Sequence, residues 1–139
     1  MPARDLYHNA VIKALIKQGW TITHDPLLLS YGGQNLFVDV GAKRTAIAAQ
    51  RGEEKIAVEI KSFLSLSPMR DLQEAVGQYD VYRTILAETE PERTLYLAVP
   101  QRVYETVFTE KIGQLILKRL RLLLITFEEE QERIVQWIL

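Results

Sequence analysis

The sequence predicts a mixed α/β fold, restriction-endonuclease-like in its arrangement, with one β-sheet flanked by helices in a single domain spanning residues 1–139. Three observations lead to this prediction. Short apolar β runs follow one another between residues 36 and 61. A long amphipathic helix separates them from a further apolar strand, which indicates a crossover connection. Two more helical stretches and two more strands complete the order α-β-β-β-β-α-β-α-α-β-β.

The first half of the chain is predicted to contain one helix and four strands. Residues 5–17 place apolar side chains along one helical face, and Gly19 would end this helix with a left-handed cap. The short connections between the later β runs favour an antiparallel meander. The expected strands are residues 20–23, 36–40, 45–49 and 55–61, and the expected turns are residues 31–35, 41–44 and 51–54.

The second half is predicted to begin with the crossover helix. Ser67 and Pro68 form a good N-cap and first-turn pair for a helix over residues 69–88. Residues 94–99 are apolar enough for a central strand. The remaining elements are helical stretches at 100–108 and 110–120, a buried strand at 122–127 and an edge strand at 133–138.

The composition limits the classes of protein to which the chain can belong. It contains no cysteine, so neither a disulfide framework nor a thiolate metal site can form. The polar N-terminus is not a signal peptide, and no apolar run approaches the roughly 18 residues of a membrane span. We therefore expect a soluble cytoplasmic protein with no membrane partner.

The net charge of −1 bears on DNA as a partner. Strong nucleic-acid binders usually carry a basic excess, so contact with DNA would need a local basic patch or a second protein. The best such patch in the sequence is formed by the predicted turn residues Lys43, Arg44, Arg51 and Lys55. Solubility at exposed turns is the alternative explanation for these charges.

Three charged residues stand within predicted apolar strands, where they are unexpected. Glu59 and Lys61 share one face of the strand at 55–61, and Asp39 lies in the apolar run at 36–40. A buried ionised carboxylate costs free energy unless it is paired or bound to a cation. Asp39 and Glu59 are therefore candidate ligands of Mg²⁺ or Mn²⁺. Lys61 is a candidate catalytic residue that would orient the attacking water, help to deprotonate it, or stabilise a phosphodiester transition state.

A purely structural explanation of these three residues stays open. Glu59 and Lys61 could form an ion pair on a half-exposed strand, and Asp39 could be hydrogen-bonded near a turn. An aspartate followed some 20 residues later by E-x-K also arises often by chance. The position of both segments on neighbouring apolar strands just before a helix favours the functional interpretation.

Asp39 followed by Glu59-Ile60-Lys61 resembles the signature of the PD-(D/E)xK, restriction-endonuclease-like superfamily. The resemblance implies a metal-dependent endonuclease in which the acidic pair and the main-chain carbonyl of Ile60 hold the metal. The proline that often precedes the aspartate in that superfamily is replaced here by Val38.

Two further features are similar to the exonuclease and phage-type branch of that superfamily. Gln78 and Tyr82 match its Q-x-x-x-Y pattern and lie one turn apart on the predicted helix, which implies contact with a phosphate or with Lys61. Core packing is the alternative for Tyr82. Asp5 and His8 lie on the first helix, from which an acidic or histidine residue often completes such sites. A capping or surface role is the alternative for both.

The chain as a whole resembles the XisH family of controlling factors for excision of the fdxN element in heterocyst-forming cyanobacteria. The resemblance implies a cyanobacterial source, a link to programmed DNA excision, and two partners, the small protein XisI and a separate site-specific recombinase. It is carried by the segments MPARDLYHNAV, GWTITHDP, AVEIKSF, GQYDVYR, LYLAVP and IVQWI.

These observations leave three functional hypotheses. The protein is a Mg²⁺-dependent endonuclease or nickase, a non-catalytic accessory factor that binds DNA or the recombinase, or an interaction module whose main ligand is XisI. A homodimer is expected if both DNA strands are cut. The apolar segment 134–139 is the candidate edge for such pairing, with packing inside the sheet as the alternative.

Overall fold

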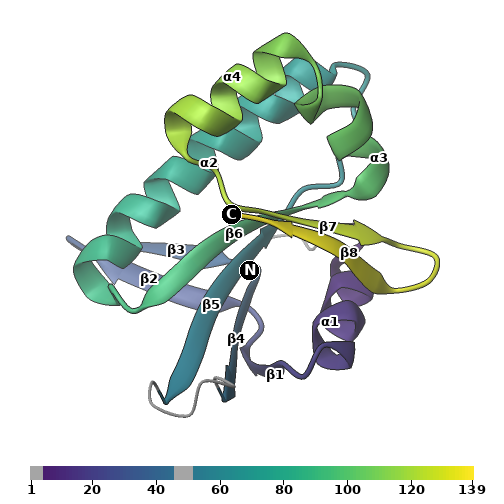
Figure 1. Cartoon of the computed structure of the whole chain (residues 1–139). Coiled ribbons are helices and arrows are strands. Elements are labelled where there is room, and N and C mark those ends of the chain that lie inside the picture. Colours follow the sequence, from purple (N-terminus) through teal and green to yellow (C-terminus); the bar gives the residue numbers. More distant parts are fainter. Residues whose placement is uncertain (1–4, 46–51) are drawn as a thin grey trace.

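The computed structural model describes residues 5–45 and 52–139 and has the mixed α/β architecture that the sequence predicts (Figure 1). Thirteen elements are present in this part of the chain. In order they are α1 (His8–Lys17), β1 (Thr21–His24), β2 (Leu27–Tyr31), β3 (Gln34–Val38), β4 (Val40–Thr45), β5 (Glu53–Ile60), α2 (Pro68–Thr89), β6 (Arg93–Pro100), α3 (Gln101–Val103), the π-helical turn η1 (Tyr104–Phe108), α4 (Lys111–Leu120), β7 (Leu124–Glu128) and β8 (Arg133–Ile138).

The main sheet has six strands in the order β1-β4-β5-β6-β7-β8. Its centre, β5-β6-β7, is parallel, because α2 connects β5 to β6 and the helices α3 to α4 connect β6 to β7. The outer pairs β1-β4, β4-β5 and β7-β8 are antiparallel. The prediction of a central strand at 94–99 is therefore confirmed, as is the placement of 133–138 at an edge.

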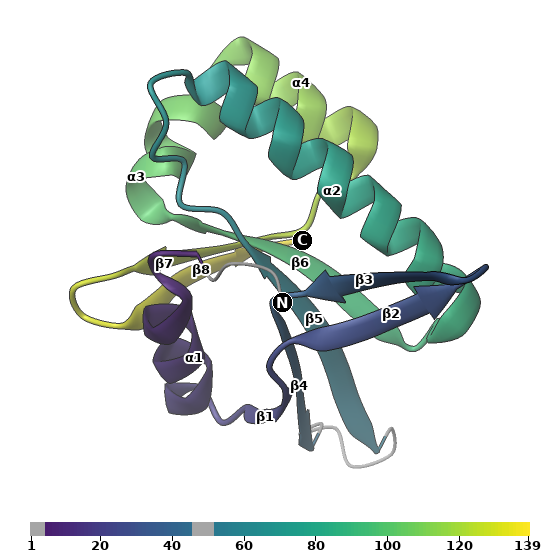
Figure 2. The same ribbon diagram turned by 180° about the vertical axis from the view of Figure 1, so that it is seen from behind.

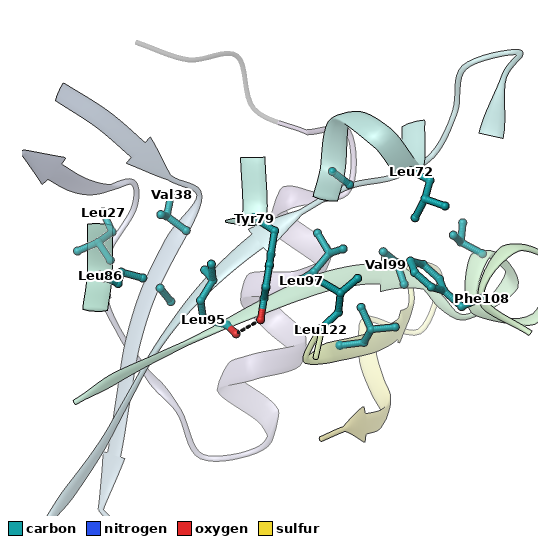
Figure 3. Close-up of a cluster of buried hydrophobic side chains, with 14 of the residues drawn as sticks. Leu27, Val38, Leu72, Tyr79, Leu86, Leu95, Leu97, Val99, Phe108 and Leu122 are labelled. Atoms are coloured by element: carbon teal, nitrogen blue, oxygen red, sulfur yellow. Dashed lines mark hydrogen bonds between the residues drawn. The ribbon is translucent and has the colours of Figure 1, made fainter. Parts of the chain in front are cut away.

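Helices cover both faces of this sheet. Helices α2 and α4 lie on one face and α1 lies on the other (Figures 1 and 2). The alternation of β5 explains how one strand serves both layers, since Ala57 points into the core beneath α2 while Ile56, Val58 and Ile60 point into the core beneath α1. Figure 3 shows the first core, in which Tyr79 of α2 reaches down to the backbone of Leu95.

The region around residues 36–40 differs from the prediction. It does not form one strand, because β3 ends at Val38, β4 begins at Val40, and Asp39 occupies the bend between them. Residues 27–31 form a strand that the sequence analysis did not identify, and β2 and β3 make a separate two-stranded hairpin. Gly32 and Gly33 form its tip with φ values of +57° and +81°, as a two-residue hairpin turn requires.

The prediction of a turn at residues 41–44 is wrong, because these residues lie inside β4 and pair with β5. Gly41 suggested a turn, but its backbone is extended and the residue is small for a packing reason. A Cβ atom at this position would come within 3.1 Å of the His24 ring and 3.3 Å of the Arg93 guanidinium. Glu53 and Glu54, predicted as turn residues, also belong to a strand. Residues 46–49 of the predicted strand 45–49, and Arg51, lie outside the described residues.

The edge strand β8 carries its own protection against pairing with another sheet. Phe127 pairs with Ile134 and Thr126 pairs with Gln136, so Val135 bulges out of the ladder. Bulges of this kind blunt sheet edges. The predicted homodimer through segment 134–139 would therefore have to form across an interrupted edge. None of the helices in the described residues is long and apolar enough to cross a membrane.

We expect Tyr79→Phe to destabilise the fold. The buried Tyr79 hydroxyl donates to the Leu95 carbonyl at 3.0 Å and accepts from the Leu123 amide at 3.3 Å, so its removal leaves a buried and a half-buried backbone group with one partner fewer. The expected loss is about 1–3 kcal/mol in the free energy of unfolding, measured with urea. The exposed Tyr31→Phe is the matched control and should change it by less than about 0.5 kcal/mol. Equal effects of the two variants would contradict this account of Tyr79.

Candidate functional site

The bend at Asp39 places its side chain at the point where the β4–β5 ladder stops. The ladder runs from Thr45 opposite Glu53 to Val40 opposite Val58, and Glu59 and Ile60 lie beyond it. At this point, side-chain hydrogen bonds replace the backbone hydrogen bonds that a longer ladder would have made. The Ile60 amide donates to Asp39 Oδ2 at 2.8 Å, and the Asp39 amide donates to Glu59 Oε1 at 3.3 Å. This reciprocal pair of hydrogen bonds fixes both carboxyl groups at the end of β5.

Lys61 completes the group of three that the sequence predicts. Its Nζ lies 3.9 Å from Glu59 Oε2, and its backbone amide donates to the Ala98 carbonyl of β6 at 3.0 Å. Glu59 is 5% exposed, whereas the Lys61 side chain is 25% exposed. The structure therefore brings Asp39, Glu59 and Lys61 together, with the two carboxyl groups set deeper than the ammonium group.

The protonation of the two carboxyl groups is unusual for their residue types. Burial, reinforced by the negative charge of Asp39, raises the pKa of Glu59 to about 8, although Lys61 opposes this shift. Burial also raises the pKa of Asp39, against the hydrogen bond from the Ile60 amide, which lowers it. A hydrogen bond between the two carboxyl groups contributes to both shifts. A pKa of about 8 favours the protonated form of Glu59 at neutral pH.

A divalent cation fits the chemistry of this donor set. The backbone amides take one oxygen from each carboxyl group, Asp39 Oδ2 and Glu59 Oε1, which leaves the second oxygens for a proton or a cation. In a strand the N–H and C=O of one residue point to the same side, so the Ile60 carbonyl is directed toward the side on which Asp39 lies. Mg²⁺ prefers such hard oxygen ligands and keeps several waters. Among the described residues, no three His, Cys, Asp or Glu side chains form a metal-holding cluster, so a metal would depend on two carboxylates, a carbonyl and water.

The helix α2 contributes Tyr82 to the surroundings of the site. Burial, together with the negative charges of Glu59 and Asp39, raises the pKa of Tyr82 to about 12, which places its hydroxyl within electrostatic reach of both carboxyl groups. The Tyr82 ring also packs against the core beneath α2, so core packing and a contact with the site are compatible for this residue. Gln78 lies one turn earlier and is exposed to solvent.

Asp5 lies beside the group of three without joining it. Its Oδ2 accepts from the Ser62 amide at 3.0 Å, its Oδ1 accepts from the Ser62 hydroxyl, and the Tyr7 amide donates to Oδ1 at 2.9 Å. The Arg102 guanidinium donates to the Ser62 carbonyl at 3.1 Å. Every polar group of Ser62, the residue after Lys61, is thus held in place. The sequence contains no local signal for this role of Ser62 and Arg102, because the contacts join positions 40 or more residues apart.

His8 is buried close to Asp39 and is paired with a residue that sequence reasoning missed. Its Nε2 lies 2.7 Å from Asp25 Oδ1, and its Nδ1 has no hydrogen-bond partner among the described residues. An electrostatic interaction with His8 is among the causes that lower the pKa of Asp39, so the two side chains are near each other. Asp25 precedes Pro26, and in the sequence this dipeptide signals only a turn.

The predicted basic patch is neutralised by neighbouring glutamates. Lys43 Nζ lies 3.1 Å from Glu53, Arg44 lies 3.4 Å from Glu54, and Lys55 lies 4.0 Å from Glu92. The first two pairs arise because β4 and β5 place Lys43, Arg44, Glu53 and Glu54 at neighbouring positions of one ladder. Arg51, the fourth member, lies outside the described residues.

We expect Glu59→Gln to raise stability, and to raise it more as the pH increases. A carboxyl group whose folded pKa is near 8, against 4.5 for the free group, favours folding fully below pH 4.5 and loses that contribution as the pH rises through 8. Glutamine keeps the oxygen that accepts from the Asp39 amide and carries no charge. The gain over wild type should be small at pH 5 and reach at least about 1 kcal/mol at pH 8, or roughly 3–4 °C in Tm. The exposed Glu88→Gln is the control, and a gain that does not depend on pH would count against the buried acidic pair.

Comparisons with known proteins identify the family of the chain. The family model described as XisH protein matches residues 1–135. A crystal structure of an XisH family protein from Nostoc punctiforme is 42% identical, with a TM-score of 0.88, over 97% of this chain and 100% of that one. The crystal structure of an fdxN element excision controlling factor protein from Anabaena variabilis is also 42% identical, with a TM-score of 0.88, over 98% and 100%. A search of curated proteins gives no match. The chain therefore belongs to the XisH family.

Proposed function

We propose that this protein controls excision of a DNA element of the fdxN kind and that Asp39, Glu59 and Lys61 form a phosphodiester-cleaving site dependent on Mg²⁺ or Mn²⁺. The first part is supported by membership of the XisH family and by the similar Anabaena variabilis protein that bears this description. The second part is supported by one observation above all. Two carboxyl groups with raised pKa values and a lysine ammonium group converge at the end of β5, where apolar side chains would stabilise the fold more.

The residues of the site have distinct parts in this proposal. When bound, Mg²⁺ lowers the pKa of a coordinated water and neutralises charge on a phosphate. Asp39 and Glu59 would hold the ion with the carboxyl oxygens that accept no hydrogen bond from a backbone amide, and Ile60 would add its carbonyl. Glu59 must first release its proton. Lys61, more exposed than the carboxyl pair, is placed to bind a phosphate oxygen or to orient the attacking water.

The surroundings supply support for these three residues. Tyr82 lies within the electrostatic reach of the carboxyl pair and can donate its hydroxyl to a phosphate oxygen, since it stays protonated far above neutral pH. Ser62, held by Asp5 and Arg102, fixes the backbone directly after Lys61. Gln78 and His8 remain proposed contacts, of which Gln78 alone is open to solvent.

A second candidate function is a non-catalytic accessory factor that acts with XisI and a separate recombinase. The observation that favours it is the charge distribution. The protein has a net charge of −1, and the cations on β4 and β5 are paired with glutamates, so the monomer offers little to hold a polyanion by itself. With this function, DNA would be bound jointly by this protein and a partner protein, or by a homodimer in which both copies contact the DNA.

A plasmid-nicking assay with Mg²⁺ or Mn²⁺ tests the cleavage proposal directly. We expect Asp39→Ala and Lys61→Ala each to lose at least about a hundredfold in rate, because each removes a group that acts on the developing charge. Lys43→Ala is the matched control, since it removes a lysine that is paired on the surface. Absence of nicking with and without XisI, or equal nicking by all four proteins, would leave the accessory factor as the better account.

Metal binding can be measured independently of cleavage by thermal unfolding in the presence of Mg²⁺. A ligand that binds only the folded state raises the Tm by mass action. Because the cation competes with the proton on Glu59, the rise should be small at pH 6 and grow toward pH 8.5. Asp39→Asn should abolish the rise. A shift of equal size in that variant would show that Mg²⁺ binds elsewhere.

A further inference from the structure

The connection between β5 and α2 exposes several large apolar side chains beside Lys61. Leu64 and Leu66 lie on this connection, Met69 lies in the first turn of α2, and Leu6 lies just before α1. All four are exposed, and Leu66 has no part of its side chain covered. Leu6 and Leu64 line a hollow of about 200 Å³ that also includes Lys61. We call these four residues together with Asp71 and Glu74 the leucine rim.

The connection that carries the rim is held in one conformation by hydrogen bonds. The Ser65 amide donates to Asp71 Oδ2 at 3.2 Å, the Ser65 hydroxyl donates to the Ser67 carbonyl at 3.1 Å, and the Ser67 hydroxyl caps α2 by accepting from the Arg70 amide at 3.2 Å. Phe63 has a φ of +55°, unusual for a residue with a side chain, and its ring packs edge-on against Phe108. The leucines are thus presented on a fixed scaffold, which lowers the entropic cost of binding a partner.

The charges around the hollow identify what kind of molecule suits it. Among the residues that the structure describes, three carboxyl groups line it, those of Asp5, Asp71 and Glu74, against the ammonium group of Lys61. Arg70, exposed in the first turn of α2, adds one positive charge outside the hollow. An apolar surface edged by carboxylates repels nucleic acid and attracts apolar groups flanked by cations.

We propose that the leucine rim binds a separate partner protein that presents apolar side chains flanked by lysine or arginine. Exposed apolar side chains grouped next to polar residues are the usual anatomy of a protein–protein contact. The partner would cover Leu64 and Leu66, pair with Asp71 and Glu74, and bring positive charge to the entrance of the Lys61 site. This inference does not depend on whether the site cleaves DNA.

A second copy of the chain suits the rim less well, although one of its surfaces has the right chemistry. The outer face of α4 exposes Ile112 and Leu115 among Lys111, Lys118 and Arg119. Helix α4 runs alongside α2 (Figure 2), and side-chain contacts place it on the side of α2 away from the hollow. Glu74 of α2 lines the hollow, whereas Arg83 of α2 donates a hydrogen bond to the end of α4. These two residues are nine positions apart, which corresponds to about 180° around a helix, so the hollow and α4 lie on opposite sides of α2. Two copies joined in this way would form an open head-to-tail chain instead of a closed pair.

The proposal is tested with a designed helical peptide that has leucines on one face and lysines on the other. Its binding to the full chain is measured by fluorescence anisotropy, and the same peptide with glutamate in place of each lysine is the charge control. We expect the lysine peptide to bind at least about tenfold more tightly than the glutamate peptide, and less tightly as salt is added. Leu66→Ser and the double variant Asp71→Asn, Glu74→Gln should each weaken it by about tenfold.

Leu115→Ser is the control, because it removes an exposed leucine from α4, away from the leucine rim. It should bind the peptide like wild type. Equal losses in Leu66→Ser and Leu115→Ser would overturn the proposal, and so would displacement of the peptide by a short DNA duplex that itself requires Asp71 and Glu74. Self-association that sedimentation detects in wild type and not in Leu66→Ser would overturn it in favour of a second copy. Asp39→Ala should keep peptide binding, so failure of the nicking assay and failure of this test are distinguishable.

Discussion

The contact between Asp39 and the end of β5 is the interaction on which the rest of the site depends. The β4–β5 ladder ends at the pair Val40 and Val58, and a residue in extended conformation at position 39 would have lengthened it. The chain bends there instead, so that a carboxyl group takes the place of a backbone carbonyl and accepts the Ile60 amide. Because of this bend, β3 leaves the main sheet and forms a separate hairpin with β2. The backbone at the end of β5 then faces the carboxyl group of Asp39, beside that of Glu59.

Burial of the Asp39 and Glu59 carboxyl groups at the end of β5 lowers the stability of the fold. Two carboxyl groups set against each other in a mostly buried position cost free energy at neutral pH, and Lys61 offsets only part of that cost from its more exposed place. Natural sequences retain such groups mainly where they bind or react. Ala57, on the same face of β5 as Glu59, is packed in the core beneath α2 and shows that this face of the strand is otherwise apolar.

The distribution of charge outside the site gives the protein two different sides. Cations on β4 and β5 are neutralised by glutamates on the same ladder, and the entrance beside Lys61 is edged by carboxylates and leucines. The cations of α4, which form no ion pair within the described part of the chain, lie on the other flank of α2. On this surface the electrostatic attraction to DNA is weak, which is the ground for the accessory factor as the second proposed function.

Hydrophobic periodicity and capping, which are local properties, determined most of the elements from the sequence alone. The long helix after Ser67, the central strand at 94–99 and the edge strand at 133–138 all follow from such patterns, and the alternation of β5 placed Glu59 and Lys61 on one face. The bend at Asp39 and the role of Gly41 were decided by tertiary structure, because both depend on what packs against β4 from other strands. The clamp on Ser62 and the pairing of His8 with Asp25 also join distant positions, and no pattern within a short window can encode a contact whose partner lies many residues away.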